Sequence, residues 1–215
     1  MKKPYSVLSI LIGFALMNIG LQCDKDDMGY KEEYSFLEKI SLTPYKKTYF
    51  ISDTIWLQFQ TSDKSLFDRF TGSRISTDTT FLQTTINYNR RFPSDTINDF
   101  FGSVKVNGGM DMTFTSSNLN FNLLRFKTEC TNNPYFFRVG FVPNKTGIYI
   151  ISAGAFVNNC PNKLKFQYSA LQFTFDLADC NKDVWLSIPP NSRGGETGVT
   201  DLRIDRKELF VFKVE

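Results

Sequence analysis

Histidine is absent from this 215-residue sequence, and its absence removes several kinds of chemistry at once. Without an imidazole there is no Ser–His or Cys–His nucleophile and no histidine-ligated metal. The four cysteines show no CxxC spacing, so we predict no zinc site. We also predict no bound cofactor. An excess of one charge is also lacking, since Lys and Arg number 25 against 22 acidic residues, without a long basic run. This composition argues against nucleic acid as a partner, because nucleic-acid-binding proteins carry clustered positive charge.

A long apolar run is missing as well, because the main apolar stretch covers only residues 7–21. It is shorter than the roughly 20 residues that a helix needs to cross the hydrocarbon core of a bilayer. Lys2 and Lys3 precede it, and the charged segment 24–27 follows it. A positive start, a short apolar core and an abrupt return to polar residues are typical of a secretory signal peptide. We therefore predict that residues 1–22 are a signal peptide.

The residues that follow this segment, Cys23 and then Lys25-Asp26-Asp27, resemble the start of surface-exposed outer-membrane lipoproteins of Bacteroidota-type bacteria. In that family the cysteine at the cleavage point is acylated, and a lysine followed by two acidic residues directs export to the cell surface. The resemblance implies a lipid such as palmitate on Cys23 and an export signal formed by Lys25, Asp26 and Asp27. It covers only the first 27 or so residues and concerns the address of the protein, not its activity.

The segment before Cys23 departs from the pattern of that family at two positions. Gly20 stands where a leucine is usual, and Gln22 stands where a small residue is usual. A soluble secreted protein and an uncleaved anchor therefore stay as alternatives to lipidation. Several acyl chains would hold the protein on the membrane permanently, since each buried methylene contributes roughly 0.8 kcal/mol. We therefore expect the protein to be anchored in the outer membrane by this lipid and exposed at the cell surface.

Aromatic residues are plentiful, with 22 phenylalanines and 9 tyrosines, and such residues favour strands over helices. Ile55, Leu57 and Phe59 alternate with Trp56 and two glutamines, which is the two-residue period of a strand with one buried face. Further strand-like segments cover residues 81–88, 119–126, 163–177 and 209–214, and a short helix is expected at 62–70. Glycine-containing turns separate the segments at residues 71–73, 107–109 and 192–195.

Short strands separated by turns predict an all-β fold, specifically an antiparallel β-sandwich with few or no helices. Residues 23–38 are charged and polar and are expected to form a lipidated N-terminus and tether. Residues 39–215 then form the sandwich, as one domain or as two sub-domains. The segment Tyr49–Leu57 also resembles an early strand of immunoglobulin-like modules in bacterial surface proteins, which implies an immunoglobulin-like sandwich.

Cysteine usage is consistent with an oxidising compartment. Setting Cys23 aside for the lipid leaves Cys130, Cys160 and Cys180, an odd number. One of these three must therefore stay unpaired, and we expect it to be a buried thiol. The pairing we predict is Cys130 with Cys160, and the alternative is Cys160 with Cys180.

The preferred pairing follows from an expected hairpin. Residues 135–142 and 147–157 are both strand-like, and the residues around Lys145 between them have turn chemistry. Cys130 and Cys160 each lie 15 residues from Lys145, so an antiparallel hairpin folded there places them opposite each other at its open end. Opposite positions in such a pair are close enough for a disulfide.

The two tryptophans are candidates for stacking against a sugar ring. Trp56 lies between Ile55 and Leu57, which favours a role in the core or between sheets. Trp185 precedes a long proline-containing loop and is the better candidate for a ligand contact.

Carboxylates offer the one route to catalysis that this composition leaves open. Asp176, Asp179 and Asp183 are the candidates, but they lie beside Lys182 and are typical of solvated loop charges. We therefore expect no catalytic residues and no enzymatic activity, and a carboxylate-dependent hydrolase is the least favoured hypothesis.

Two functional hypotheses from different classes follow. The first is a non-catalytic binding or adhesion module for a glycan, peptide or protein, presented at the cell surface on a rigid sandwich. The alternative is a structural accessory subunit that packs against an outer-membrane partner protein, which a large exposed apolar patch would favour. No arrangement of residues in the sequence identifies the ligand or the partner.

Overall fold

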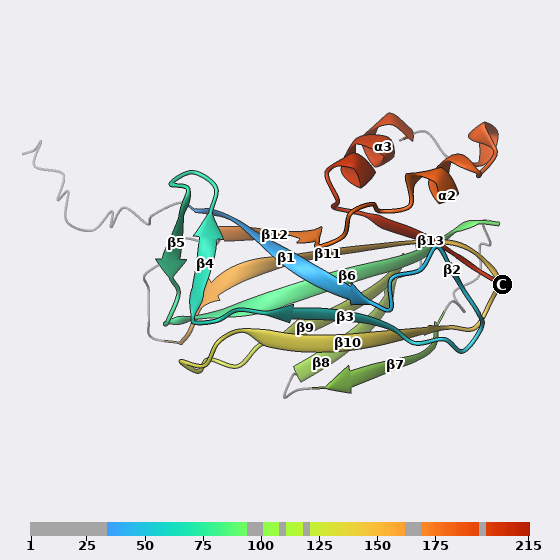
Figure 1. Cartoon of the computed structure of the whole chain (residues 1–215). Coiled ribbons are helices and arrows are strands. Elements are labelled where there is room, and N and C mark those ends of the chain that lie inside the picture. Colours follow the sequence, from blue (N-terminus) through green and yellow to red (C-terminus); the bar gives the residue numbers. More distant parts are fainter. Residues whose placement is uncertain (1–33, 94–100, 108–110, 118–120, 162–168, 194–196) are drawn as a thin grey trace, which may run out of the picture. The chain divides into compact units, whose positions relative to one another are not determined.

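Strands dominate the part of the chain that the computed structural model describes, which is residues 34–93, 101–107, 111–117, 121–161, 169–193 and 197–215. Helices are few and short, so the all-β prediction is confirmed (Figure 1). The predicted signal peptide at residues 1–22, Cys23, and the export signal Lys25-Asp26-Asp27 lie outside the described residues.

The strands form one large mixed sheet whose main path runs β7-β10-β3-β1-β12-β11-β6-β9-β8. Off this path, β13 pairs with β11 and β2, while β4 pairs with β1 and β5. The strands are β1 (Ser35–Thr43), β2 (Thr48–Tyr49), β3 (Ile55–Gln60), β4 (Ser65–Asp68), β5 (Ser73–Ser76), β6 (Thr80–Phe92), β7 (Phe101–Asn107), β8 (Asp111–Ser117), β9 (Phe121–Lys127), β10 (Phe136–Pro143), β11 (Gly147–Asn159), β12 (Ser169–Phe175) and β13 (Phe210–Val214).

The first strand joins two groups of strands and corrects two expectations. Ser35–Ile40 of β1 pair in parallel with β12, whereas Ser41–Thr43 pair antiparallel with β3. A second parallel pair joins β13 to β2, so the sheet is mixed and the purely antiparallel prediction was wrong. The alternation of a strand reveals its faces but not the direction of its partner. Folded structure also begins before residue 39, because Phe36 is fully buried in β1 within the expected tether.

The core is rich in aromatic rings. Ile55, Leu57 and Phe59 of β3 are at most 1% exposed, as their alternation predicts. Rings of β10 contact rings of strands that are not its neighbours in the sheet order: the centroid of Phe141 is 5.2 Å from Tyr88 of β6, and that of Phe137 is 4.9 Å from Phe126 of β9. Strands distant in the pairing order therefore share one core.

The expected helix at residues 62–70 does not form, since β4 occupies that region and pairs with β5 as a hairpin. Gly72 in the turn has a φ of +66°, a conformation that glycine adopts without steric cost. The buried Asp68 carboxylate accepts backbone N–H groups from Ser35 (2.9 Å) and Thr71 (2.8 Å). The bond from Ser35 attaches the hairpin to β1, a non-local contact that a local helical pattern cannot show.

The expected hairpin of residues 135–142 and 147–157 is also wrong. Both segments are strands, but β10 lies between β3 and β7, whereas β11 lies between β6 and β12. β11 pairs along most of its length with the equally long β6, which gives it many more backbone hydrogen bonds than the shorter β10 offers. A turn sequence brings two strands together only when neither has a better partner.

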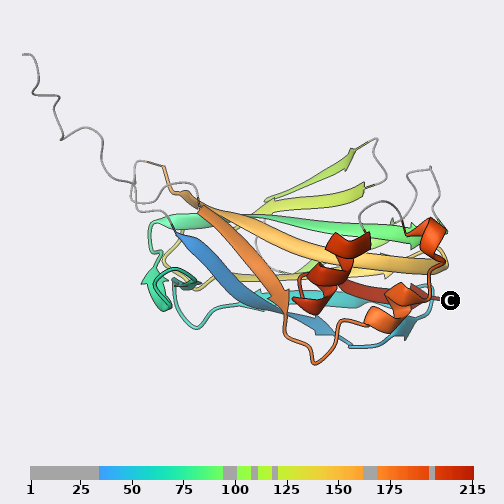
Figure 2. The same cartoon turned by 90° about the horizontal axis from the view of Figure 1, so that it is seen from above.

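The helices gather near the C-terminus, beside β13 (Figures 1 and 2). They are α2 (Lys182–Leu186), a short 3-10 helix at Pro190–Ser192, and α3 (Thr197–Asp205). The fully buried Asn181 attaches α2 to the sheet, because its Nδ2 donates to the carbonyl of Val211 (2.8 Å) and its Oδ1 accepts from Tyr45 (3.0 Å). Within the described residues, none of these helices has the length and apolarity needed to span a bilayer.

Candidate functional site

A disulfide joins Cys130 to Cys160 with a Cα separation of 5.7 Å, which confirms the predicted pairing. Its basis differs from the expected hairpin, because the two cysteines follow β9 and β11, the strands on either side of β6. The backbone N–H of Thr128 donates to Leu82 (2.9 Å) and that of Cys160 donates to Thr79 (2.8 Å). The disulfide thus closes the end of the sheet at which β6 begins. Cys180 is a free, buried thiol, as expected.

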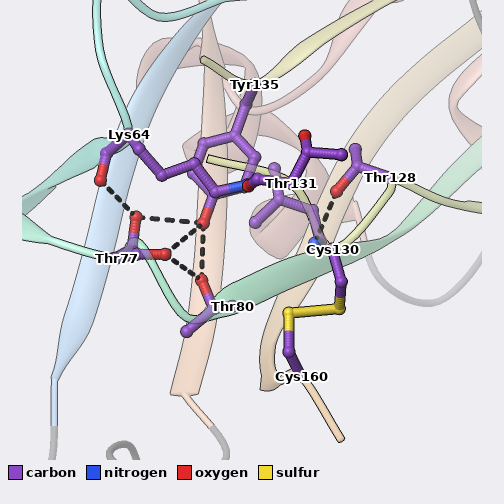
Figure 3. The surroundings of a disulfide bond; sticks show 9 residues. Lys64, Thr77, Thr80, Thr128, Cys130, Thr131, Tyr135 and Cys160 are labelled. Atoms are coloured by element: carbon purple, nitrogen blue, oxygen red, sulfur yellow. Dashed lines mark hydrogen bonds between the residues drawn. A yellow bond between two sulfur atoms is a disulfide. The ribbon is translucent and has the colours of Figure 1, made fainter. Parts of the chain in front are cut away.

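Tyr135 is the centre of a buried polar cluster next to this disulfide (Figure 3). The residue is 1% exposed, and its hydroxyl is hydrogen-bonded to the Oγ1 atoms of Thr80 (2.5 Å) and Thr77 (2.9 Å). Its backbone exchanges two hydrogen bonds of 3.0 Å with Thr61. Burial raises the pKa of Tyr135, so the phenol stays neutral at physiological pH. The ring is therefore held rigidly at both ends.

Lys64, immediately before β4, places a cation against this ring. The residue is 6% exposed, its Nζ lies 4.2 Å from the Tyr135 ring centroid, and it donates a 2.7 Å hydrogen bond to the carbonyl of Thr131. Its own carbonyl accepts both the N–H (2.8 Å) and the Oγ1 (2.9 Å) of Thr77. Burial lowers the pKa of Lys64, and the nearby Asp78 partly opposes this. Backbone and side chain of the lysine are thus both fixed.

A pocket of about 230 Å³ opens beside Lys64 and Tyr135, and we call it the disulfide-end pocket. Its walls combine hydroxyl, amide, carboxylate and apolar groups. The remaining lining residues are Thr128, Glu129, Thr131, Asn133, Pro134 and Phe136. Phe136 is 40% exposed at the start of β10. Such a pocket can hold a small polar group between hydrogen-bonding side chains and an accessible ring.

Trp185, the predicted ligand contact, lies elsewhere and is 1% exposed. It belongs to α2, and its Nε1 donates a 2.5 Å hydrogen bond to Asp201 of α3. The ring is turned inward from this helix, so the fold as it stands gives a ligand no access to it. The indole holds the two helices together.

Trp56 is half-buried on the face of β3 opposite to Ile55 and Leu57. Its ring lies against Gly140 of the neighbouring β10, where a Cβ atom would come within 3.0 Å of two ring carbons. The guanidinium of Arg138 stands 4.4 Å from the ring centroid. Trp56 thus packs against strand β10 and a cation, rather than in the core shared with Phe59.

The three candidate aspartates do not converge on one site. Asp176 pairs with Lys39 (3.1 Å), and Asp183 pairs with Lys47 (2.8 Å), whose hydrogen bond lowers the pKa of the carboxyl. Asp179 accepts the backbone N–H of Asn181. Within the described residues, no three His, Cys, Asp or Glu side chains are grouped as a metal site requires.

The residues of the disulfide-end pocket were not identified from the sequence. Lys64 lies in the segment expected to be a helix, and Tyr135 was assigned only to a strand. The one usable signal was Cys130, since a disulfide near a candidate loop marks a rigid place in the fold. Nothing local in the sequence shows that Lys64 and Thr131, 67 positions apart, meet.

No family model matches this chain, and no curated protein matches it either. Two solved fragments of the human F-spondin reeler domain are similar in structure. The first is 11% identical with a TM-score of 0.36, covering 71% of this chain and 93% of that chain. The second is 15% identical with a TM-score of 0.33, covering 64% of this chain and 93% of that chain.

Proposed function

We propose that this protein is a cell-surface lipoprotein whose folded domain is a non-catalytic binding module, with the disulfide-end pocket as its ligand contact. One observation carries the proposal: a cation and an aromatic ring are held rigidly beside a pocket at one end of the sheet. Binding sites gain affinity from such pre-organisation, because less conformational freedom is lost when the ligand arrives.

The fold that we propose for presenting this pocket is a β-sandwich of the immunoglobulin-like type. Its support is the aromatic contact between β10 and strands β6 and β9, since rings from two facing layers meet in this way. The switch of β1 from β12 to β3 supplies the connection between the two layers. In sandwiches, ligand contacts commonly lie on loops at one end, which is where residues 128–135 are found.

The address we propose is the outer face of the outer membrane, with a lipid on Cys23 and export directed by Lys25-Asp26-Asp27. The support is the sequence pattern alone. Incorporation of labelled palmitate and the intact mass of the membrane-extracted protein test it. We expect a mature chain that begins at Cys23 and carries acyl chains, and a Cys23→Ser variant that is released from the membrane. A variant that stays membrane-bound would contradict the proposal.

Binding is tested with the mature chain carrying Cys23→Ser on an array of glycans and peptides. We expect a signal that Phe136→Ala reduces and that Phe50→Ala leaves unchanged. Both rings are exposed, by 40% and 61%. Ser52, close to Phe50, donates its N–H to Pro143 at the far end of β10, so the control lies a strand length from the pocket. The absence of any signal, or equal loss in both variants, would contradict a role for the pocket.

A second candidate function, the structural accessory subunit, is favoured by apolar side chains on the helices. Val199 and Leu202 of α3 are 57% and 48% exposed and lie three residues apart, hence on one side of the helix. Leu186 at the end of α2 is 46% exposed. Cross-linking in intact cells, followed by mass spectrometry, tests this function: the double variant Val199→Ser/Leu202→Ser should lose a cross-link to an outer-membrane protein.

A further inference from the structure

The Lys64 ammonium is a buried cation without a carboxylate partner in the described part of the chain. Asp78 acts on this ammonium only from beyond ion-pair distance. The one hydrogen bond that Lys64 Nζ donates among the described residues goes to the neutral carbonyl of Thr131. An ammonium has three N–H donors, so this bond and the Tyr135 ring do not exhaust its capacity. Burial of a charge is unfavourable unless a counter-charge or further hydrogen bonds compensate it. Because Lys64 also lines the disulfide-end pocket, this pocket suits an anion.

The Lys64 side chain does not extend into solvent. The main chain of Lys64 is fixed by two hydrogen bonds from Thr77, and Thr77 is in turn bonded to the Tyr135 hydroxyl (Figure 3). A flexible lysine that costs energy when buried would normally extend its side chain into water. This side chain instead runs along the Tyr135 ring toward Thr131, beside the pocket.

The walls of the pocket indicate what the rest of the ligand carries. Thr128, Thr131 and Asn133 line the pocket and carry hydroxyl and amide groups, which both donate and accept hydrogen bonds as sugar hydroxyls do. The Thr128 hydroxyl oxygen already accepts the N–H of Leu82 (2.9 Å). Phe136 offers an accessible ring for a pyranose face. Glu129, an exposed carboxylate in the lining, can accept hydrogen bonds from hydroxyls and repels negative charge, more strongly the more charges a ligand carries.

The volume limits the size of the bound group. About 230 Å³ is below the roughly 300–1,000 Å³ typical of pockets for drug-sized ligands. One sugar residue fits this space better than a segment of a chain does. The contact is thus expected to involve a terminal or branching residue of a larger glycan.

From these features we infer that the disulfide-end pocket binds a singly charged acidic sugar, with its carboxylate on the Lys64 ammonium and its ring against Phe136. The inference rests on the proposed binding function and specifies its ligand class. Hydrogen bonds between charged groups are short and about twice as strong as neutral ones, so the carboxylate should dominate the selectivity.

The test uses the mature chain with Cys23→Ser and titration calorimetry with D-glucuronate, its neutral amide D-glucuronamide, and D-glucose. We expect glucuronate to bind at least about tenfold more tightly than either neutral sugar. Lys64→Met should remove this preference, while Lys39→Met, at a lysine whose side chain is 75% exposed, should leave it unchanged. The comparison of glucuronate with its amide needs no variant, so it decides the question even if Lys64→Met fails to fold.

Several outcomes would overturn the inference. Equal affinity for glucuronate and glucuronamide, with both reduced by Phe136→Ala, removes the role of charge but leaves the pocket as a binding site. Tighter binding of N-acetylglutamate than of glucuronate replaces the sugar by a peptide acid. Binding of none of these probes removes the acidic-sugar assignment, and the array with Phe136→Ala then decides separately whether the pocket binds anything.

Discussion

The two ends of the sheet bury polar and aromatic groups in contrasting ways. At the helical end, the Trp185 indole donates to Asp201, and the Asn181 side chain bonds to the backbone of the neighbouring β13. At the disulfide end, the Tyr135 hydroxyl is satisfied by two threonines, but the cation of Lys64 has no counter-ion among the described residues and faces a pocket. At the helical end these polar side chains find their hydrogen-bond partners within the protein, which stabilises the fold. At the disulfide end the Lys64 ammonium keeps hydrogen-bonding capacity that a ligand could use.

The sequence singled out the helical end for a ligand contact, whereas the buried cation with no counter-ion in the described part of the chain lies at the disulfide end. Trp185 near a proline-rich loop is the kind of residue that often contacts ligands, yet it is a buried link between two helices. Lys64 lacks any local signature. The more informative criterion is whether a buried polar group finds its partner within the protein.

The largest expected effect comes from breaking the disulfide end. Cys130→Ala/Cys160→Ala opens a link between residues 30 positions apart, which should reduce the free energy of unfolding by roughly 3.6 kcal/mol through the added freedom of the unfolded chain. Urea denaturation of the Cys23→Ser chain and of this variant measures the difference. A loss below about 1 kcal/mol would mean that the surrounding hydrogen bonds hold this end without the disulfide.

A second test concerns the thiol at the helical end. Burial raises the pKa of Cys180 from 9.0 to about 11, and the residue is 2% exposed. At pH 8 its thiolate fraction should therefore be roughly 100-fold lower than in the unfolded chain. Iodoacetamide should label native Cys23→Ser protein at least that much more slowly than denatured protein, as mass spectrometry can follow.

The same shift has a defined sign for stability. A thiol whose pKa is higher in the fold than in the unfolded chain contributes stability that is fully present below pH 9 and is lost as the pH rises through about 11. Cys180→Ala should remove this contribution to the alkaline loss of stability. Rapid labelling of the native thiol at pH 8 would show that the helical end opens readily.

Variants of Asn181 test how much the hydrogen bonds at the helical end stabilise the fold. Asn181→Ala should cost about 2 kcal/mol, since two carbonyls lose a donor and a non-glycine residue must keep a φ of 58°. Asn181→Gly removes the same hydrogen bonds but accepts that φ, so it should be about 1 kcal/mol less destabilising than alanine. Thermal or urea unfolding measures both variants. Equal effects would show that the hydrogen bonds, rather than the backbone conformation, dominate.

The smallest expected effect is that of Tyr135→Phe, which keeps the ring under Lys64 but removes the hydroxyl between Thr77 and Thr80. We expect a loss of about 1 kcal/mol in urea unfolding. Affinity for glucuronate should change little, because the ring and the cation stay in place. A large loss of affinity with unchanged stability would instead make the hydroxyl part of the binding site.

Alternating residues predicted strands well because alternation is a local property. The segments at 55–60 and 81–88 lie in strands, the segment at 209–214 contains β13 from Phe210 on, and Ile55, Leu57 and Phe59 face the core as expected. The helix α3 was missed, because Gly198 and the glycines before it favour a loop in a local interpretation. The packing of α3 against α2, to which Asp201 is bonded, is a non-local contact that favours the helix.

The disulfide shows that a correct prediction can rest on an incorrect pairing. Cys130 and Cys160 were placed together by a hairpin of β10 and β11 that does not form. They meet because β9 and β11 both pair with β6, one on each side. A hairpin folded at Lys145 and the pairing of two strands with β6 would each place the same two cysteines side by side, but only the second is present.

The sequence by itself determined that strands dominate, which face of an alternating strand such as 55–60 is apolar, and which chemistries are impossible without histidine, because period and composition act locally. Tertiary structure alone decided which strands pair and in which direction, and it alone brought Lys64, Thr131 and Tyr135 to one pocket. The physical reason is that burial and desolvation depend on neighbours distant in the chain. A lysine that the fold withdraws from water without supplying a counter-charge keeps capacity for an anion, and this capacity is the basis of the proposed binding.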